Sequence, residues 1–269
     1  ILVTGSTDGI GKATARALAG QGHRVLLHGR NRKKGRTVLA ELEAATGSDR
    51  LSLFIADLSV QEQIRDLARE VDQAYGRLDR LINNAGVFMP EREIAPGGIE
   101  MTFAVNYLAP FLLTHELLPL LNRSVPARVV NVASIAHRSV RSIDRENLPG
   151  FEDYDGYDAY AVSKVGVVAF TMRLARTLEG TGVTANCLHP GVIDTKLLRA
   201  YMGRGGGGAP PEKGAEGETH LATSPDAGNV NGGYFEENRW TRPSHLALDP
   251  DVQGWFWEMG LDLTGTGWW

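Results

Sequence analysis

Residues 4–11 read Thr4-Gly5-Ser6-Thr7-Asp8-Gly9-Ile10-Gly11 and stand between an apolar run at residues 1–4 and a helical pattern that begins at Gly11. Gly5 permits a tight turn, Gly9 lets the backbone approach a pyrophosphate, and Gly11 allows a helix to pack closely on a strand. The free N–H groups at the helix N-terminus favour an anion. The stretch predicts a dinucleotide phosphate site, although a strand-to-helix turn without a ligand uses the same residue types.

Short aliphatic runs alternate with longer amphipathic stretches on both sides of this loop. This alternation predicts an α/β fold, a doubly wound parallel sheet of the Rossmann type, in a single domain over residues 1–269. We expect parallel strands at residues 1–4, 24–28, 51–56, 78–83, 128–133 and 183–188, with a late edge strand at 232–235. We expect helices at residues 11–19, 33–45, 61–75, 98–121 and 158–180.

The stretch Gly203-Arg204-Gly205-Gly206-Gly207-Gly208-Ala209-Pro210-Pro211 interrupts the pattern. It has few apolar groups to offset its ordering entropy, and we expect a mobile loop there. A surface insertion and a substrate lid are equally compatible with it. The variable substrate loop is expected at about residues 197–219.

The composition limits the classes of partner. The chain has 28 Lys and Arg against 32 Asp and Glu, a formal charge of -4, so nucleic acid is not an expected partner. The single cysteine, Cys187, leaves no disulfide framework and no thiol cluster for a metal site, which favours the cytoplasm. No stretch reaches the ~18 uninterrupted apolar residues of a membrane span. The chain begins without Met, so a targeting segment or anchor upstream stays open.

The cofactor preference is expected to depend on the end of the second strand. A carboxylate there accepts hydrogen bonds from the ribose 2′-hydroxyl of NAD, whereas this chain has His28-Gly29-Arg30-Asn31. Gly29 makes room, and Arg30 offers a planar fork to a 2′-phosphate. The pattern predicts NADP(H) in preference to NAD(H), while the neighbouring lysines, Lys33 and Lys34, can equally be solvent-facing cations at the start of a helix.

A phenol and an ammonium group follow in the second half of the chain. Tyr160 and Lys164 stand at i and i+4, one turn apart on the same helix face. An adjacent cation favours the phenolate and draws a pKa near ~10 toward the working range. Ser134 follows a buried strand, where its hydroxyl can hold a carbonyl oxygen. Singly, each residue is explained by a surface pair or a turn; together they indicate proton transfer.

In these motifs the sequence resembles the short-chain dehydrogenase/reductase family, in its compact branch, over nearly the whole chain. The resemblance implies that Tyr160 transfers the proton, Ser134 orients the substrate oxygen, Lys164 binds the nicotinamide ribose and Asn106 supports a proton relay. The expected catalytic residues are therefore Asn106, Ser134, Tyr160 and Lys164. The implied cofactor-binding residues are Gly5, Ser6, Thr7, Asp8, Gly9, Ile10, Gly11, Arg30, Asn31, Asp57, Leu58, Asn84, Ala85, Gly86, Tyr160, Lys164, Pro190, Gly191, Ile193 and Thr195.

Within the family, Ser134-Ile135-Ala136-His137 and His189-Pro190-Gly191 look like the retinol-dehydrogenase-like group. The glycine-rich stretch near Gly205 departs from that group where the family builds its substrate pocket. We expect His137, His189 and Cys187 to be packing or turn residues, because the chemistry is already supplied. Among the tryptophans, Trp255 and Trp257 are expected to pack, and Trp268 and Trp269 stay undecided.

The resemblance implies an enzyme that transfers a hydride between NADP(H) and a small-molecule alcohol or carbonyl substrate, with Tyr160 as general acid/base. The alternatives are a cofactor-binding regulator or scaffold with little turnover and, less well supported, a methyltransferase-like nucleotide binder. Relatives commonly pair through helices corresponding to residues 98–121 and 158–180, so we expect a homo-oligomer.

Overall fold

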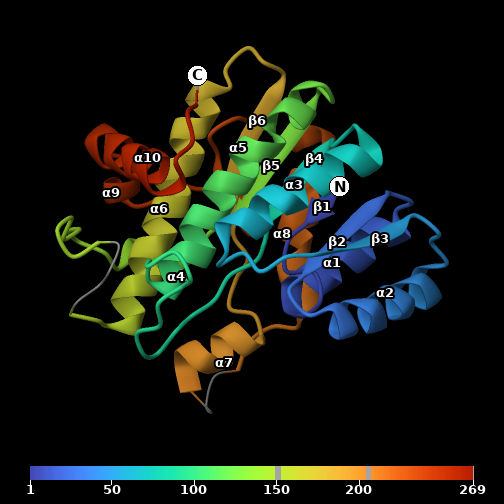
Figure 1. Ribbon diagram of the computed structural model, residues 1–269, viewed down its shortest axis with the longest axis horizontal. Coiled ribbons are helices and arrows are strands. Elements are labelled where there is room, and N and C mark those ends of the chain that lie inside the picture. Colours follow the sequence, from blue (N-terminus) through green and yellow to red (C-terminus); the bar gives the residue numbers. More distant parts are fainter. Residues whose placement is uncertain (149–152, 204–206, 269) are drawn as a thin grey trace.

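The computed structural model describes residues 1–148, 153–203 and 207–268, and in this part of the chain eight strands form one sheet (Figure 1). Their order is β3-β2-β1-β4-β5-β6-β7-β8, with every pairing parallel except that of β7 with β8. The strands are β1 (Leu2–Val3), β2 (Val25–Gly29), β3 (Leu51–Ile55), β4 (Arg80–Asn83), β5 (Ala127–Val132), β6 (Val183–His189), β7 (Tyr234–Glu236) and β8 (Arg239–Trp240).

Helices cover both faces of the sheet, as the alternating pattern predicts. Neighbouring strand residues point to opposite faces, so Leu2 and Leu81 enter one core while Val3 and Ile82 enter the other. The first core lies under α3 (Gln61–Tyr75), α5 (Ala109–Asn122) and α6 (Gly156–Thr177). The second lies under α1 (Gly9–Gly20), α2 (Arg32–Thr46) and α8 (Pro211–Thr223). The doubly wound α/β fold is confirmed.

The predicted helix at residues 98–121 is composite. It consists of α4 (Met101–Phe103), a π-helical turn η1 (Ala104–Leu108) and α5. By length and composition alone, Met101–Asn122 could cross a membrane, but 83% of its apolar window is buried inside the fold. It occupies the position of a core helix.

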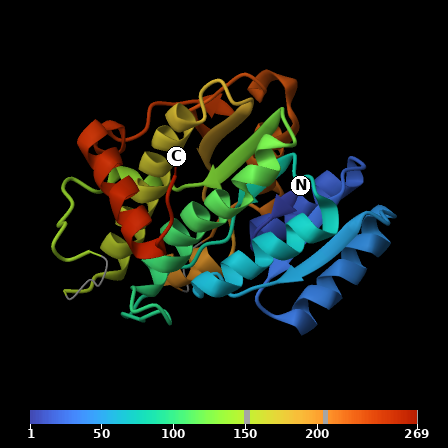
Figure 2. The ribbon, with the colours of Figure 1, turned by 45° about the horizontal axis from the view of Figure 1, so that its top comes forward.

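The C-terminal helices form an outer layer on α5 and α6. They are α9 (His245–Leu248) and α10 (Pro250–Thr264), and the red α10 lies outside the green and yellow helices in Figure 2. Trp257 packs against Phe111 of α5 and Phe170 of α6, and Trp268 contacts both phenylalanines. Packing is thus the role of Trp257, while Trp269 lies outside the described residues. The two helices expected to pair copies of the chain are covered by its own C-terminus.

The expected substrate loop at residues 197–219 is largely helical, which corrects the prediction. It contains α7 (Lys196–Met202) and the start of α8, while residues 204–206 lie outside the described part. Ala209 is held by backbone hydrogen bonds of 2.8 Å with Val192 and Asp194. Composition failed to predict α8 because its small residues allow close packing that composition does not reveal: Gly214 packs against Ile10 and Ile193.

Glu218 anchors α8 to α1 from inside the fold. The fully buried Glu218 accepts a 2.7 Å hydrogen bond from Thr14 of α1. Burial raises the pKa of this carboxyl to about 8, although the Thr14 hydrogen bond acts to lower it. A neutral carboxyl is cheaper to bury than a charged one, and this explains how a polar sequence forms a packed helix here.

Candidate active site

A cleft of about 470 Å³ opens at the carboxyl ends of the strands. It lies where the strand order reverses between β1 and β4, the position at which doubly wound sheets bind ligands. Most of the predicted site residues line it. Three do not: Ser6 and Asn106 are buried behind its wall, and Asn31 lines a neighbouring groove.

The phosphate loop is as tight as its glycines predict. Gly5 and Gly9 have left-handed φ angles of 66° and 51°. A Cβ on Gly11 would lie 2.3 Å from the Asn84 side chain and 2.7 Å from the Gly5 carbonyl oxygen. The Asp8 carboxylate caps α1 by accepting from the Gly9 N–H at 2.9 Å. The three glycines therefore line the cleft with backbone that carries no side chain of its own.

His28 fixes this loop, a role that sequence reasoning missed. The Gly5 N–H donates to His28 Nδ1 at 3.1 Å, so the ring proton is on Nε2, which lies 3.1 Å from the Ala56 carbonyl oxygen. Burial lowers the pKa of His28 to about 4, which keeps the ring neutral. Ser6 completes the contact by accepting from the His28 N–H at 2.8 Å. The ring joins the loop, β2 and the end of β3.

Asn84 holds the next loop against the first. Its side-chain amide donates to the Thr4 carbonyl at 2.7 Å, and its backbone N–H donates to the Thr4 hydroxyl at 3.0 Å. The N–H of Ala85 donates to the same hydroxyl. The predicted Asn84-Ala85-Gly86 segment is thereby placed along the cleft wall.

The segment that follows β2 holds several cations, of which Arg30 lines the cleft and Lys34 forms an ion pair. A Cβ on Gly29 would lie 2.6 Å from the Thr7 side chain, so this position must stay small. Arg30 is exposed, lines the cleft and forms no ion pair within the described chain. Lys34 instead binds Asp8 at 2.5 Å, and the Asn31 side chain accepts from the Lys34 N–H at 2.9 Å. Among the Lys and Arg side chains that line the cleft in the described chain, Lys196 is paired with Asp8 and Lys164 is bonded to Val132, which leaves Arg30 for a ligand.

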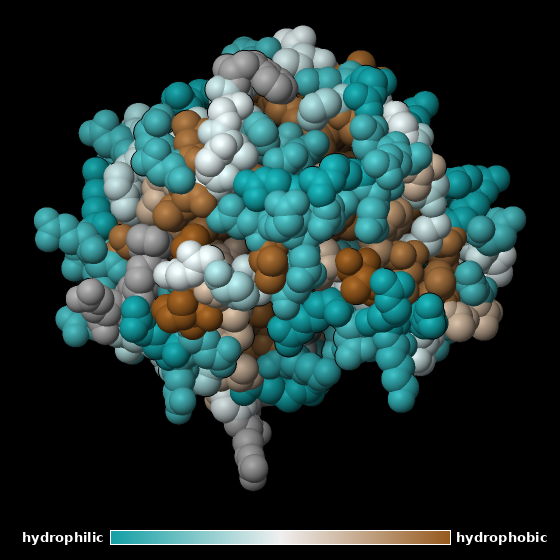
Figure 3. Space-filling view, viewed as in Figure 1, coloured by the Kyte–Doolittle hydropathy of each residue, from teal (hydrophilic) through white to brown (hydrophobic). Residues whose placement is uncertain are grey.

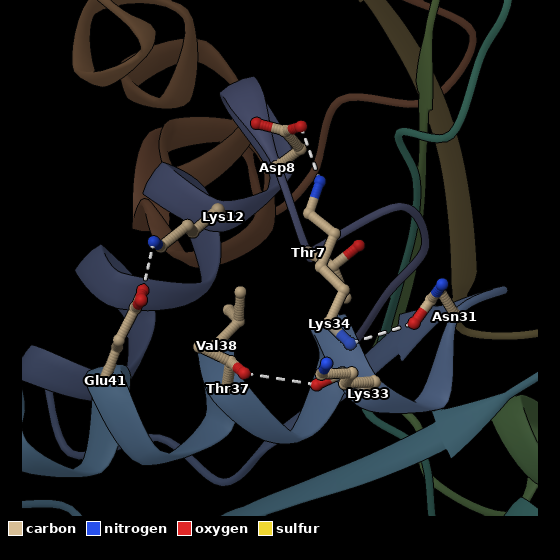
Figure 4. Close-up of a pocket in the computed structure, with 9 residues that line it drawn as sticks. All are labelled: Thr7, Asp8, Lys12, Asn31, Lys33, Lys34, Thr37, Val38 and Glu41. Atoms are coloured by element: carbon tan, nitrogen blue, oxygen red, sulfur yellow. Dashed lines mark hydrogen bonds and ion pairs between the residues drawn. The ribbon is translucent and has the colours of Figure 1, made fainter.

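Figure 4 shows the neighbouring groove, which lies between α1 and α2. Its charged side chains are largely used within the protein: Lys12 pairs with Glu41, and Lys34 with Asp8. Burial acts to raise the pKa of Asp8, but hydrogen bonds from Lys196 and Lys34 hold it well below its usual range. Asp8 remains ionised at neutral pH and ties α2 and α7 to the phosphate loop.

Tyr160 and Ser134 meet deeper in the cleft. Ser134 follows β5 and begins the short helix η2 (Ile135–Arg138), and Tyr160 lies in the first half of α6. Burial raises the pKa of Tyr160 to about 12, and a hydrogen bond with the Ser134 side chain acts in the opposite direction. The pKa lowering expected from Lys164 is not present in this structure; the phenol stays protonated at neutral pH.

Lys164 is held by the backbone of β5. Its Nζ donates to the Val132 carbonyl at 2.9 Å and lies 5.6 Å from the centre of the Tyr160 ring. Burial lowers the pKa of Lys164 to about 8. The ammonium is close to the phenol, but both groups lose solvation, and burial outweighs their mutual effect.

Asn106 lies in the π-helical turn rather than on the cleft surface. Its side chain accepts from the Val87 N–H at 2.8 Å and donates to the Val87 carbonyl and the Ser163 hydroxyl. A Cβ on Gly86 would lie 3.3 Å from Asn106 Oδ1 and 3.7 Å from Lys164 Nζ. Asn106 therefore stands behind Lys164, next to the loop after β4.

The remaining predicted cofactor contacts also line the cleft. Asp57 accepts from the Ser59 N–H and hydroxyl at 2.9 and 2.7 Å, which fixes its carboxylate at the end of β3. Thr195 caps α7 by accepting from the Leu198 N–H at 3.2 Å, and its methyl lies over Gly9. Leu58, Pro190, Gly191 and Ile193 are further lining residues.

Comparison with known proteins agrees with this geometry. The short chain dehydrogenase model matches residues 1–203. Mouse retinol dehydrogenase 13 is 38% identical, with 98% of this chain and 83% of that protein aligned, and human retinol dehydrogenase 11 is 36% identical over 98% and 85%. The chain belongs to the short-chain dehydrogenase/reductase family.

This short-chain dehydrogenase/reductase also has solved structural relatives. A protein from Mycobacterium paratuberculosis superposes with a TM-score of 0.82 at 26% identity, covering 98% of this chain and 92% of that one. A short chain dehydrogenase from Burkholderia cenocepacia in complex with NADP has a TM-score of 0.71 at 27% identity, covering 88% and 97%. The chain is an NAD(P)-dependent enzyme of the retinol-dehydrogenase-like group.

The cleft of this dehydrogenase fits such a cofactor. A Cβ on Gly11 or Gly29 would lie only 2.3 or 2.6 Å from Asn84 or Thr7, and one on Gly9 would lie 3.2 Å from Thr195. Gly9 and Gly11 instead leave the backbone open to a pyrophosphate. Asp57, Lys164 and Thr195 place a carboxylate, an ammonium and a hydroxyl along the same wall. The cleft wall thus offers both hydrogen-bond acceptors and hydrogen-bond donors, as a dinucleotide with hydroxyl and phosphate groups requires.

The wall of the cleft that α7 forms is mainly apolar. Helix α7 has no buried residue, although Leu197, Leu198, Tyr201 and Met202 lie on it and face the cleft. The Tyr201 ring lies 5.5 Å from the ring of Tyr160 and 5.1 Å from that of Phe88. The face in Figure 3 is mainly hydrophilic, with apolar side chains in separate patches. Apolar groups beside Tyr160 are thus left for a ligand to cover.

Proposed function

We propose that this enzyme transfers a hydride between NADP(H) and the carbonyl or alcohol carbon of an apolar small-molecule substrate, with Tyr160 as general acid/base. The observation that carries the proposal is the convergence of Ser134, Tyr160 and Lys164 at the inner end of the cleft. The bound nicotinamide would supply or accept the hydride. The phenol of Tyr160, protonated at neutral pH, suits proton donation in the direction of carbonyl reduction.

The roles of the other side chains follow from their contacts. Ser134 donates to the substrate oxygen and thereby places it beside the Tyr160 hydroxyl. Lys164 keeps a positive charge next to the phenol and lies where a ribose hydroxyl can accept from it. Asn106 stabilises the loop after β4 through its hydrogen bonds with Val87, and this loop lies against Lys164. Buried charge and fixed donors supply the electrostatic part of catalysis.

The preference for NADP(H) is proposed from Arg30 and Gly29. Arg30 has no ion-pair partner among the described residues, and Gly29 places no carboxylate where a 2′-phosphate would lie. An exposed guanidinium can donate charge-assisted hydrogen bonds to the phosphate, and it gives up few contacts within the protein to do so. Asn31, beside it, keeps the start of α2 in place.

The substrate class is proposed from the apolar wall and from the relatives' names. Mouse polyprenol dehydrogenase and the retinol dehydrogenases are named after long unsaturated alcohols. Tyr201, Leu198 and Met202 offer such a chain apolar contact. Of the two lysines that line the cleft near them in the described chain, Lys196 is paired with Asp8 and Lys164 donates to the Val132 carbonyl. We therefore favour neutral apolar aldehydes and alcohols.

The test is a steady-state assay with NADPH and NADH across a series of aldehydes of increasing apolar length, including retinal. We expect turnover with NADPH at a higher kcat/KM than with NADH, rising with the apolar length of the aldehyde. Absence of turnover with every aldehyde and alcohol, despite tight NADPH binding, would favour the cofactor-binding scaffold instead.

Location and assembly are proposed separately. We propose a cytoplasmic enzyme, from its single buried thiol. A homo-oligomer is also proposed, but α10 covers α5 and α6, so its copies would meet through a different surface. Light scattering on the full chain measures the mass directly.

A further inference from the structure

His137 makes two contacts with the Ser134 carbonyl. Its backbone N–H donates to this oxygen at 3.2 Å, and its ring Nδ1 lies 2.6 Å away. The Ser134 hydroxyl oxygen meanwhile accepts from the Ala136 N–H at 3.2 Å. The proposed substrate-binding hydroxyl is therefore part of a turn that His137 closes from behind.

The second ring nitrogen fixes the tautomer of His137. The Ser244 N–H donates to His137 Nε2 at 3.0 Å, and a backbone amide can only donate. Nε2 is consequently unprotonated, and Nδ1 carries the proton that it donates to Ser134. The ring is fully buried, and burial lowers its pKa, in agreement with a neutral imidazole.

The His137 ring contacts a segment that lies C-terminal to the part matched by the short chain dehydrogenase model, which ends at residue 203. We call residues 234–244 the C-terminal brace. Its Tyr234 ring stands edge-on to His137, with centroids 4.9 Å apart. Glu236 accepts from the Tyr234 hydroxyl and from Arg138 at 2.9 Å, and Arg138 also donates to the Arg242 carbonyl.

We infer that His137 is a positioning residue, which transmits the placement of the C-terminal brace to Ser134 and so sets where the substrate oxygen is held. The inference rests on the proposed function, because it acts through the proposed role of Ser134. A shift of ~1 Å in a positioning contact can cost ~100-fold in rate without any change in the reacting groups. The histidine thus does more than fill space at the end of the sheet.

The experiment separates the two halves of the ring. In His137→Asn the shorter amide can still donate to the Ser134 carbonyl, whereas in His137→Gln the longer amide reaches toward Ser244 and the side-chain contact with Ser134 is lost. We expect kcat for aldehyde reduction to fall about 10- to 100-fold in His137→Gln and His137→Ala, and to recover to within about threefold in His137→Asn. NADPH affinity should stay at the wild-type value in all three, and His245→Asn, exposed on α9, is the matched control.

A double variant makes the route through Ser134 explicit. If His137 acts through Ser134, adding His137→Ala to Ser134→Ala lowers kcat no further. Equal losses in all three His137 variants, or additive losses in the double variant, would overturn the inference and leave a purely structural histidine. Failure of the wild-type enzyme to turn over any aldehyde would instead count against the proposed function, so the two failures are distinguishable.

Discussion

The two ends of the cleft are built in opposite ways. At the cofactor end, a single added Cβ on Gly11 or Gly29 would lie 2.3 or 2.6 Å from a neighbouring side chain. At the substrate end, α7 buries none of its residues. Close packing requires specific residue types and so produces a recognisable sequence motif, whereas an open apolar wall can be built from many different apolar residues. The cofactor end should therefore be intolerant of small changes that the other regions absorb.

The first and largest test exchanges glycine for alanine in two helices. Gly11→Ala places a Cβ against Asn84 and Gly5, so we expect a loss of about 1–3 kcal/mol in unfolding free energy and about 100-fold weaker NADPH binding. Gly254→Ala in α10 meets nothing within 4 Å and should stabilise the protein by about 0.5–1 kcal/mol. Urea unfolding and fluorescence titration measure both; equal effects would remove the contrast.

The second test concerns the free cation at the cofactor end. Arg30→Ala should lower kcat/KM for NADPH by about 10- to 100-fold, the value of a charge-assisted hydrogen bond, and leave kcat/KM for NADH unchanged. Lys12→Ala, whose ammonium is already paired with Glu41, is the matched control. An equal loss with both cofactors would mean that Arg30 acts on the fold and does not select NADP(H).

The third test uses pH. The pKa of Lys164 is lowered to about 8 by burial, so its positive charge is present below pH 8 and is lost as the pH rises through that value. The pKa of Tyr160 lies higher, at about 12, so the phenol remains a donor throughout. Reductive kcat should fall about tenfold per unit above pH 8. A kcat that does not change up to pH 10 would show that the reaction does not require the positive charge of Lys164.

The smallest effect is expected at the substrate end. Tyr201→Ala removes a ring that contacts Tyr160 and Phe88, and we expect KM for an apolar aldehyde to rise about 3- to 10-fold with NADPH affinity unchanged. Tyr201→Phe keeps the ring and should behave as wild type. A change in NADPH affinity in Tyr201→Ala would show that α7 serves the cofactor end as well.

The same contrast explains what the sequence could predict. The sheet, the phosphate loop and the Tyr160–Lys164 pair follow from local rules of spacing and turn chemistry, and their positions agree with the structure. Helix α8 could not be predicted, because its stability comes from the fit of Gly214 against Ile10 and from neutral Glu218 against Thr14, contacts between distant segments. The loop-fixing role of His28 depends likewise on its contact with Gly5, and the C-terminal brace depends on contacts with His137 and Arg138 of η2.

The pKa of Tyr160 was the least predictable property of the site. Spacing alone indicates a cation beside a phenol, but the sign of the shift depends on how deeply both groups are buried. Here burial dominates and raises the pKa, which a sequence does not encode at any single position.

The most direct measurement is a single-turnover reaction in which enzyme preloaded with NADPH is mixed with an apolar aldehyde and nicotinamide oxidation is followed by stopped flow. We predict that Tyr160→Phe binds NADPH as tightly as wild type while its oxidation rate falls about 1000-fold, because the substrate oxygen loses its proton donor. An unchanged oxidation rate in Tyr160→Phe would contradict the assignment of the phenol as the acid.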